Sequence, residues 1–172
     1  LKEIIIPENV TEMEDGIFNS CSSLESVTLP DGLAKMGKYV FVACNNLKDI
    51  NIPSALKELP EGTFHDCCAL EDVVIPASST AIGINTFHNC QSLKNVTIPA
   101  GVTKIGASAF EYCHNMTGDR VLPDSLTYMG ESAFSTCYNI SSITIGKGLD
   151  TISANAFDYT INAENVSLVI PD

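Results

Sequence analysis

The chain repeats one pattern of residues about every 23 positions along its length. Phenylalanine recurs at steps of 23 or 24 residues, at Phe18, Phe41, Phe64, Phe87, Phe110, Phe134 and Phe157. A cysteine stands three residues after each of the first six, and a threonine stands there after the seventh. The stretch LKNVTIPAGVTKIGASAFEYCHN, residues 93–115, shows the unit almost unchanged. Because one such unit cannot bury its apolar side chains alone, the repeat predicts stacked coils that bury one another.

Each unit is predicted to contain a short strand, a corner and a compact turn. The segment LxxVxI alternates apolar residues, mostly β-branched, as a half-buried strand does. Proline ends the strand because it has no N–H to donate to a ladder. Val102, Ile105 and Gly106 turn a corner, where a second short strand is an option, and ASAF is short enough for one turn of α- or 3₁₀-helix. The inward positions are expected to be Leu24, Val27, Leu29, Leu33, Met36, Phe41 and Cys44, repeated in every coil.

The period and spacing together resemble the BspA-type leucine-rich repeat family, on the motif LxxVxIPxxVxxIGxxAFxxC at Leu93–Cys113. The resemblance covers essentially the whole chain. It implies an α/β-type leucine-rich repeat fold: a right-handed solenoid with a parallel β-sheet on the concave side and short strands, turns or 3₁₀ segments on the convex side. About seven and a half 23-residue coils are expected, as a single solenoid over residues 1–172. Because Leu1 already lies inside a repeat, we expect the chain to be a fragment of a longer protein.

Two departures from the repeat carry structural predictions. Between Met116 and Leu122 the unit gains one residue in the sequence TGDRV, which predicts a bulge in the sixth strand. Ser79 stands at a position where most copies have an apolar residue.

Seven cysteines in a secreted protein would ordinarily suggest disulfides. Cysteines stacked in register lie about 5 Å apart with parallel Cβ vectors, whereas a bridge needs Cβ atoms about 3.8 Å apart. We therefore favour a buried column of free thiols, with an occasional disulfide, a metal site or catalysis as alternatives. Cys68 lies outside the column and is expected to point outward as the most reactive thiol.

Few residues suggest metal binding or catalysis. His65 and His88 each follow a repeat phenylalanine and should stack in neighbouring coils, with Glu111 next along. Such a row could hold zinc or nickel. We favour an exposed surface on which two coils carry histidine, and assign no metal ligand, cofactor or catalytic residue. No nucleophile motif, zinc-protease motif or phosphate loop is present.

One surface column is expected to form ion pairs. The residue after the first apolar position alternates in sign through Lys2, Glu25, Lys48, Glu71 and Lys94. Stacked at the spacing of neighbouring strands, these side chains predict a ladder that opposes a slip of one coil, which would place like charges together. We interpret this column of charges as a feature that stabilises the fold and not as a binding site.

Function is expected on the exposed face of the strands, the usual ligand surface of leucine-rich repeats. The third strand position reads Glu3, Ser26, Asp49, Asp72, Asn95, Asp119 or Arg120, Ser142 and Asn165. The fifth reads Ile5, Thr28, Asn51, Val74, Thr97, Val121, Thr144 and Ser167. The candidate ligand-binding residues are Asp49, Asn51, Asp72, Asn95, Thr97 and Arg120. Asp49 beside Asp72 could receive a partner's lysine or arginine, or loosely hold Ca²⁺; the alternative is an ordinary solvated strand face.

Charge and hydropathy argue against some classes of binding partner. With 21 acidic against 9 basic residues the net charge is −12, which argues against nucleic acid and anionic membrane surfaces. No apolar run approaches the roughly 18 residues of a membrane span. The family resemblance implies a non-catalytic adhesion module of a secreted or cell-surface bacterial protein, with a protein ligand such as a host matrix or surface protein. A rigid spacer that displays other domains and binds nothing itself is the alternative.

Overall fold

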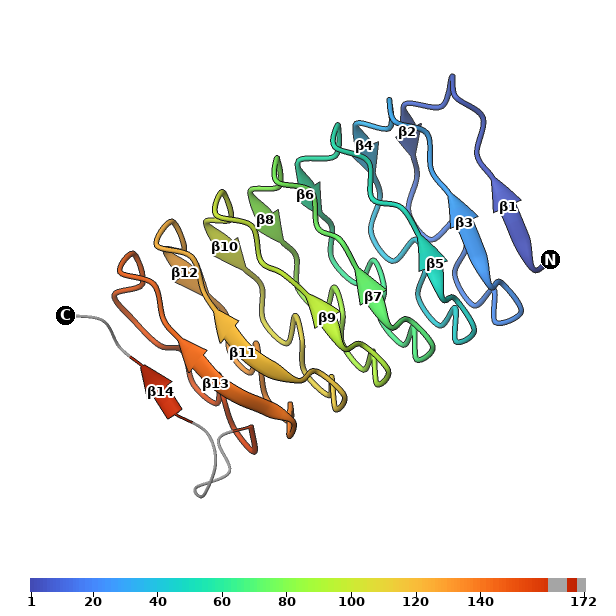
Figure 1. The fold of residues 1–172 in the computed structure, drawn as a ribbon. Helices are drawn as coiled ribbons and strands as arrows, with labels where there is room; N and C mark the ends of the chain where they lie inside the picture. Colours follow the sequence, from blue (N-terminus) through green and yellow to red (C-terminus); the bar gives the residue numbers. More distant parts are fainter. Residues whose placement is uncertain (161–166, 170–172) are drawn as a thin grey trace.

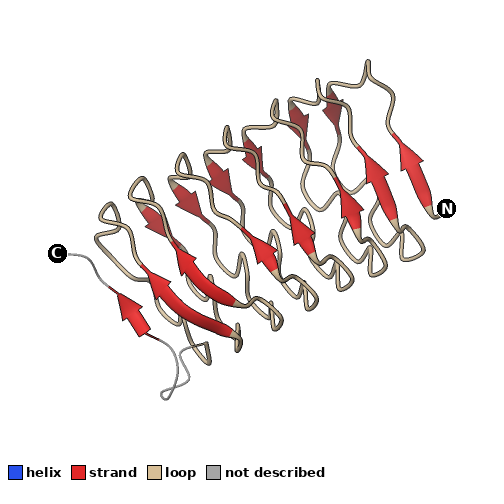
Figure 2. Ribbon diagram, in the orientation of Figure 1, coloured by secondary structure: helices blue, strands red, loops and turns tan. Residues whose placement is uncertain are grey.

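The computed structural model describes residues 1–160 and 167–169, and these residues form a β-solenoid (Figures 1 and 2). The strands stack into two parallel ladders on two sides of the coil. The first ladder contains β1 (Glu3–Ile5), β3 (Ser26–Thr28), β5 (Asp49–Ile50), β7 (Asp72–Val73), β9 (Asn95–Val96), β11 (Gly118–Val121), β13 (Ile140–Thr144) and β14 (Ser167–Val169). The second contains β2 (Glu12–Met13), β4 (Lys35–Met36), β6 (Glu58–Leu59), β8 (Ala81–Ile82), β10 (Lys104–Ile105) and β12 (Tyr128–Met129).

The predicted solenoid and its parallel sheet are confirmed, and the second short strand at the corner is present. In the described part of the chain, six coils carry a strand in both ladders, from β1 and β2 to β11 and β12. The expected count of about seven and a half coils was therefore slightly too high. The described residues contain no helix, and hence none that could cross a membrane.

The first ladder is not one continuous sheet. Its strands are hydrogen-bonded in three groups, β1–β3–β5, β7–β9 and β11–β13–β14. The predicted bulge is confirmed, since the pairing of β11 with β13 shifts between Gly118 and Asp119. At the end of the ladder Ser142 pairs with Ser167, so the expectation that Ser167 takes the fifth position is wrong. The last coil is two residues longer there, which moves Ser167 into the third position; Asn165 lies outside the described residues.

The turn around the repeat phenylalanine is not the predicted helical turn. In each coil one residue two positions before the phenylalanine and one two positions after it adopt positive φ, for example Ser108 at 52° and Tyr112 at 63°. A left-handed residue interrupts right-handed helical geometry, so the segment folds as consecutive turns. The backbone of each turn bonds to the next coil, as in Phe110 N–H to the Ala133 carbonyl at 2.8 Å. The turns therefore form a third hydrogen-bonded edge of the solenoid.

The repeated phenylalanines form a continuous stack inside the solenoid. Neighbouring rings lie 4.9–6.2 Å apart between centroids, at interplanar angles of 6–23°. The five central rings are at most 1% exposed. Offset stacking of this kind contributes about 0.5–1.5 kcal/mol per pair beyond the buried area. The prediction of stacked inward columns is confirmed for these rings and for the leucine and valine columns beside them.

The prediction of buried free thiols is confirmed for five of the six cysteines in the column, while Cys21 in the first coil is only partly buried. The column also has a role that the sequence did not indicate. Cys44, Cys67, Cys90, Cys113 and Cys137 are fully buried and unbridged. Each Sγ donates to the carbonyl oxygen of the phenylalanine one coil earlier, at 3.1–3.2 Å. Burial raises the pKa of Cys44 to about 11 and of Cys137 to about 12, so these thiols remain protonated donors at neutral pH.

Thr160 shows that donation matters in this column. It replaces cysteine in the seventh copy, is fully buried, and its hydroxyl donates to the Phe134 carbonyl. The same hydroxyl accepts a hydrogen bond from the Cys137 N–H at 2.8 Å. The column therefore holds small side chains with a hydrogen to donate, and threonine meets this requirement as cysteine does.

Glycine at the corner is explained by close approach between coils. Gly106 does not have positive φ, so a left-handed backbone is not the reason for glycine at this position. A Cβ on Gly106 would lie 2.4 Å from the Ile84 nitrogen, inside the backbone of the preceding coil. The corner therefore requires glycine for space.

Candidate functional site

The outward face of the first ladder contains most of the candidate residues. Asp49, Asn51, Asp72, Asn95 and Thr97 are all exposed there. Third-position side chains stack in register within each hydrogen-bonded group, as in Glu3, Ser26 and Asp49. The structure thus brings the predicted residues to one face, but it divides them where the ladder breaks.

A groove of about 600 Å³ lies over β7 and β9. It is lined by Asp72, Val73, Val74, Ile75, Pro76, Ala77, Asn95, Thr97, Pro99 and Ala100. Three of the predicted candidates, Asp72, Asn95 and Thr97, are therefore at one groove. Val74 is 82% exposed in this lining. Exposed valine beside a carboxylate and an amide gives the groove both apolar and polar contact surface.

Asp72 and Asn95 act as a pair at the polar side of this groove. The two residues are direct partners in the β7–β9 register, and the Asn95 Nδ2 donates to Asp72 Oδ1 at 2.6 Å. Asp72 Oδ2 is left to contact a ligand. Asp49, the next acidic residue along the face, lies across the break between β5 and β7. Two carboxylates at facing positions disfavour close strand pairing, which fits the position of this break.

The side chain of Asn51 is hydrogen-bonded to the backbone of the preceding coil. Its Oδ1 accepts from the Leu29 N–H at 2.7 Å, and its Nδ2 donates to the Leu29 carbonyl at 2.8 Å. The side-chain amide thus reproduces the two hydrogen bonds of a ladder next to the point where backbone pairing of β3 and β5 ends. Asn51 is exposed, but both ends of its amide already have partners.

Arg120 does not lie on the outward face. It pairs in register with buried Ile143, so it takes an inward position, and Asp119 takes the third position opposite Ser142. Its guanidinium donates to the carbonyls of Lys94 at 2.9 Å and Val96 at 3.3 Å, and to that of Thr117. These bonds replace strand pairing across the gap between β9 and β11. The Arg120 side chain therefore links the bulged strand to the preceding coil. We exclude it from the candidate ligand-binding residues.

The predicted charge ladder forms in part. Lys2 bonds to Glu25 and Lys94 to Glu71, each at 2.7 Å between Nζ and a carboxylate oxygen. The hydrogen bond from Lys2 and its charge lower the pKa of Glu25, and Lys48 adds a smaller effect through space. Lys48 itself makes no ion pair within 4 Å in the described residues. The break between β5 and β7 separates Lys48 from Glu71. The ladder consists of two local pairs on either side of that break.

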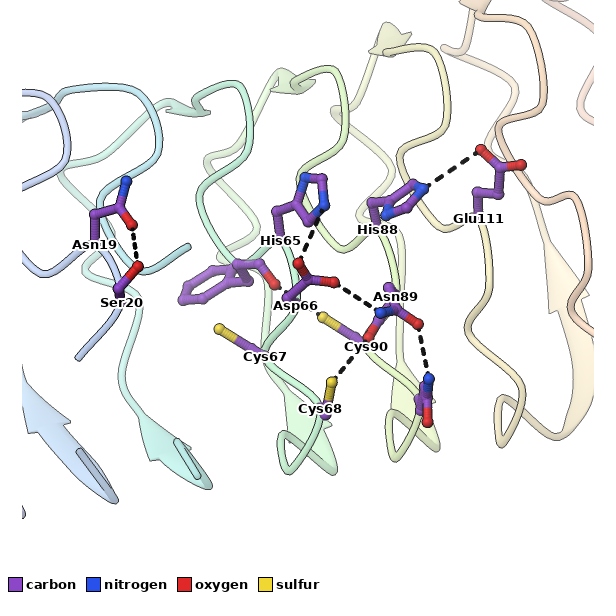
Figure 3. Close-up of polar contacts among 12 residues, drawn as sticks. Asn19, Ser20, His65, Asp66, Cys67, Cys68, His88, Asn89, Cys90 and Glu111 are labelled. Carbon is purple, nitrogen blue, oxygen red and sulfur yellow. Dashed lines mark hydrogen bonds and ion pairs between the residues drawn. The ribbon is translucent and has the colours of Figure 1, made fainter. Parts of the chain in front are cut away.

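A second cluster lies on the phenylalanine turns (Figure 3) and shares no residue with the groove. His65 and His88 stack as predicted, with ring centroids 4.5 Å apart, and His88 Nε2 lies 3.7 Å from Glu111 Oε2. Asp66 completes the cluster, with its Oδ2 3.5 Å from His65 Nε2. Burial lowers the pKa of His88, and the neighbouring His65 lowers it further.

The sequence analysis missed two aromatic side chains on the neighbouring turns, of which Tyr112 contacts the cluster. Tyr112 contacts His88 at 5.4 Å between centroids, and Tyr138 stacks on His114 at 5.2 Å. Both tyrosines are 40% or more exposed. Tyr112 stands two residues after Phe110, at the left-handed position of the turn. The recurrence of that position in the repeat was the signal that could have placed it.

Comparison with known proteins finds similarity to leucine-rich repeat proteins. The model of the BspA type leucine rich repeat region matches residues 1–117 and 117–170, in six copies. No curated protein matches the chain.

Solved structures resemble the fold closely. A leucine-rich repeat protein from Bacteroides ovatus is 28% identical with a TM-score of 0.88, over 98% of this chain and 46% of that one. A leucine rich repeat protein of T. pallidum is 29% identical with a TM-score of 0.79, over 88% of this chain and 72% of that one. A leucine rich cell surface protein from Faecalibacterium prausnitzii, at 22% identity and a TM-score of 0.57 over 99% of this chain and 62% of that one, shares the fold alone. The chain spans less than half the length of the Bacteroides protein.

Proposed function

The chain belongs to the BspA-type leucine-rich repeat family, and on that premise we propose that it is a non-catalytic module that binds a protein ligand at the β7–β9 groove. The observation that carries the proposal is the meeting of Asp72, Asn95, Thr97 and exposed Val74 in one concave surface. Val74 turns its apolar side chain to solvent, whereas Val73 and Val96, on the inward side of the same two strands, are 3% and 4% exposed.

The chemistry of the groove indicates the ligand. Asp72 and nearby Asp49 favour a lysine or arginine, because a charged hydrogen bond to a carboxylate is stronger than a neutral one. Val74, Pro76 and Pro99 offer apolar contact beside it. An extended segment with a basic residue next to an apolar one fits both. A Ca²⁺ ion held by the two aspartates is not favoured, since the ladder is broken between them.

We place the module in a secreted or cell-surface bacterial protein, with adhesion to a host matrix or surface protein as its role. The support is the family and a structural neighbour described as a leucine rich cell surface protein. A catalytic role is not proposed, because repeat solenoids of this family are scaffolds and the groove offers one carboxylate with no neighbouring base or nucleophile.

A rigid spacer that binds nothing is the second candidate. The side chains of Asn51 and Arg120 favour this candidate, because both are hydrogen-bonded to the backbone. Fewer polar side chains on the outward face are therefore free to contact a ligand. The groove also lacks the tryptophan, tyrosine and arginine residues that dominate binding energy in protein interfaces.

Charge reversal separates the two candidates. The double variant Asp49→Lys/Asp72→Lys is compared with Glu8→Lys/Asp31→Lys, which changes the net charge equally at exposed positions outside the groove. Both are tested against immobilised matrix and cell-surface proteins and against a displayed library of random peptides. The binding module predicts capture by the wild type and the control, loss in the groove variant, and unchanged melting temperatures. No capture by any of the three would support the spacer, and equal capture by all three would place the ligand elsewhere.

A further inference from the structure

Two neighbouring coils place a histidine-rich cluster on the turn edge of the solenoid (Figure 3). His65 and His88 follow the stacked Phe64 and Phe87, whose ring centroids lie 5.3 Å apart. The Asp66 N–H donates to the His88 carbonyl at 2.9 Å. Stacking and backbone bonding therefore fix the positions from which these side chains extend.

The polar atoms of the cluster are spaced for one metal ion. One potential ligand atom from each of His65, Asp66 and His88 lies within 4.8 Å of the other two. At bond lengths of about 2.0–2.2 Å, neighbouring ligands of a tetrahedral zinc ion lie about 3.3–3.6 Å apart. His65 Nε2 and Asp66 Oδ2, at 3.5 Å, already meet that spacing. Small rotations of His88 would complete the set.

His88 presents a free nitrogen. Its Nδ1 is buried and has no hydrogen-bond partner among the described residues, while its Nε2 faces Glu111 at 3.7 Å. A proton on Nε2, directed at the Glu111 carboxylate, leaves a lone pair on Nδ1. A histidine that donates to a carboxylate through one nitrogen and binds a metal through the other is a common arrangement at metal sites.

Asp66 is oriented in the same way. The Asn89 Nδ2 donates to Asp66 Oδ1 at 2.7 Å, which leaves Oδ2 on the side of His65. In Figure 3 the two imidazoles lie side by side, with Asp66 next to His65 and Glu111 on the far side of His88. Asp66 and His88 thus each have a partner outside the expected ligand set that fixes their orientation.

The electrostatics also favour a cation. Metal ligation requires neutral imidazole. Two protonated imidazoles at 4.5 Å between centroids would repel each other, whereas the Asp66 and Glu111 carboxylates attract positive charge to the cluster.

We propose that His65, Asp66 and His88 bind one divalent transition-metal ion such as Zn²⁺, with Glu111 and Asn89 as positioning residues. Two imidazoles and one carboxylate suit zinc, nickel, cobalt or copper. Three protein ligands leave one coordination position for water or for a donor atom of a partner. The ion joins two successive coils, so binding also stabilises the folded chain against unfolding. This site is separate from the proposed groove and does not depend on it.

Titration with Zn²⁺ by calorimetry, and with Co²⁺ followed by visible absorption, tests the proposal on the full chain under reducing conditions. The wild type should bind one ion per chain and melt at a higher temperature with Zn²⁺ present. His65→Gln and His88→Gln should each abolish saturable binding, and His65→Gln retains the test if the half-buried His88 variant fails to fold. Glu111→Gln should weaken binding about tenfold to a hundredfold.

Two matched controls complete the experiment. His114→Gln changes the third histidine of the chain, which lies outside the cluster, and should bind as the wild type does. Cys68→Ser removes the half-exposed thiol near Asn89 and should also leave binding unchanged. The proposal is wrong if the wild type shows no saturable one-to-one binding, if either histidine variant of the cluster binds normally, or if His114→Gln or Cys68→Ser abolishes binding.

Discussion

Replacement of Cys90 tests whether the buried thiols act as hydrogen-bond donors or only fill space. Cys90 lies in the fourth turn of the column, fully buried, and its Sγ donates to the Phe64 carbonyl at 3.1 Å. The two informative variants are Cys90→Ala, which removes the sulfur and the donor, and Cys90→Ser, which shortens the side chain and keeps a donor.

The expected loss follows from two contributions. The contacts of a buried sulfur are comparable to those of a methylene, about 0.8 kcal/mol, with a small cavity added. A neutral hydrogen bond contributes about 1 kcal/mol net. Cys90→Ala should therefore lower the free energy of unfolding by about 2 kcal/mol. Cys90→Ser should lose about half as much, because the hydroxyl reaches the same carbonyl, as Thr160 does in the seventh coil.

Urea unfolding followed by circular dichroism measures these differences, with an unchanged m-value as the sign that only stability has altered. Cys68→Ala is the matched control, because Cys68 is half-exposed and its Sγ is 3.6 Å from the Asn89 carbonyl; its effect should stay below about 0.5 kcal/mol. A serine variant less stable than the alanine variant would refute the donor role. So would an alanine variant within about 0.5 kcal/mol of the wild type.

Three further outcomes are expected. Ser79→Val should raise the free energy of unfolding by about 1–2 kcal/mol by urea unfolding, because the Ser79 hydroxyl is buried with no partner among the described residues in a position that is apolar in other coils; a destabilised variant would contradict this. Gly106→Ala should cost about 1–3 kcal/mol in the same assay, since its Cβ would meet the preceding backbone at 2.4 Å, whereas Gly32→Ala, with nothing within 4 Å, should be nearly neutral. In the native protein at pH 8, a thiol reagent monitored by mass spectrometry should label Cys68 well before Cys90, whose pKa burial raises well above the ordinary value; equal rates would show that the column opens to solvent.

The spacing of the repeat was sufficient to predict the solenoid, the inward columns and the strand face. Each of these features depends only on the repeat period and not on the contacts of individual side chains. The turn geometry was not predictable in this way. The left-handed positions are occupied by residues as different as Gly16, Tyr39 and Asn85, so no residue type marks them. Their conformation is imposed by backbone bonds to the next coil.

The outward face was predicted as a set of positions, and the structure shows which of them are free. The extra residue in the sixth strand left the sequence consistent with either Asp119 or Arg120 on this face. Only the register with β13 turns Arg120 inward, onto the carbonyls of Lys94 and Val96. In the same way, the amide of Asn51 was identified as polar and exposed, but its partners one coil away depend on where strand pairing ends. The hydrogen-bond partners of such side chains depend on local breaks in the ladder. The repeat period does not predict where these breaks lie.

The histidine row shows the same limit. Sequence spacing predicted that His65, His88 and Glu111 stack, and they do. It did not indicate Asp66, because the predicted helical turn ended at the repeat phenylalanine and no conformation was predicted for the residues after it. The positive φ of Asp66, 62°, belongs to the turn that places its carboxylate beside His65.

Hydrogen exchange with and without a captured host protein tests the central proposal, recognition at the groove, most directly. Bound ligand should slow amide exchange in residues 72–77 and 95–100, which line the groove, and leave the phenylalanine turns unchanged. The Asp49→Lys/Asp72→Lys variant should show no slowing with the same protein. Slowing confined to the turns, or slowing that persists in the charge-reversed variant, would contradict recognition by this face.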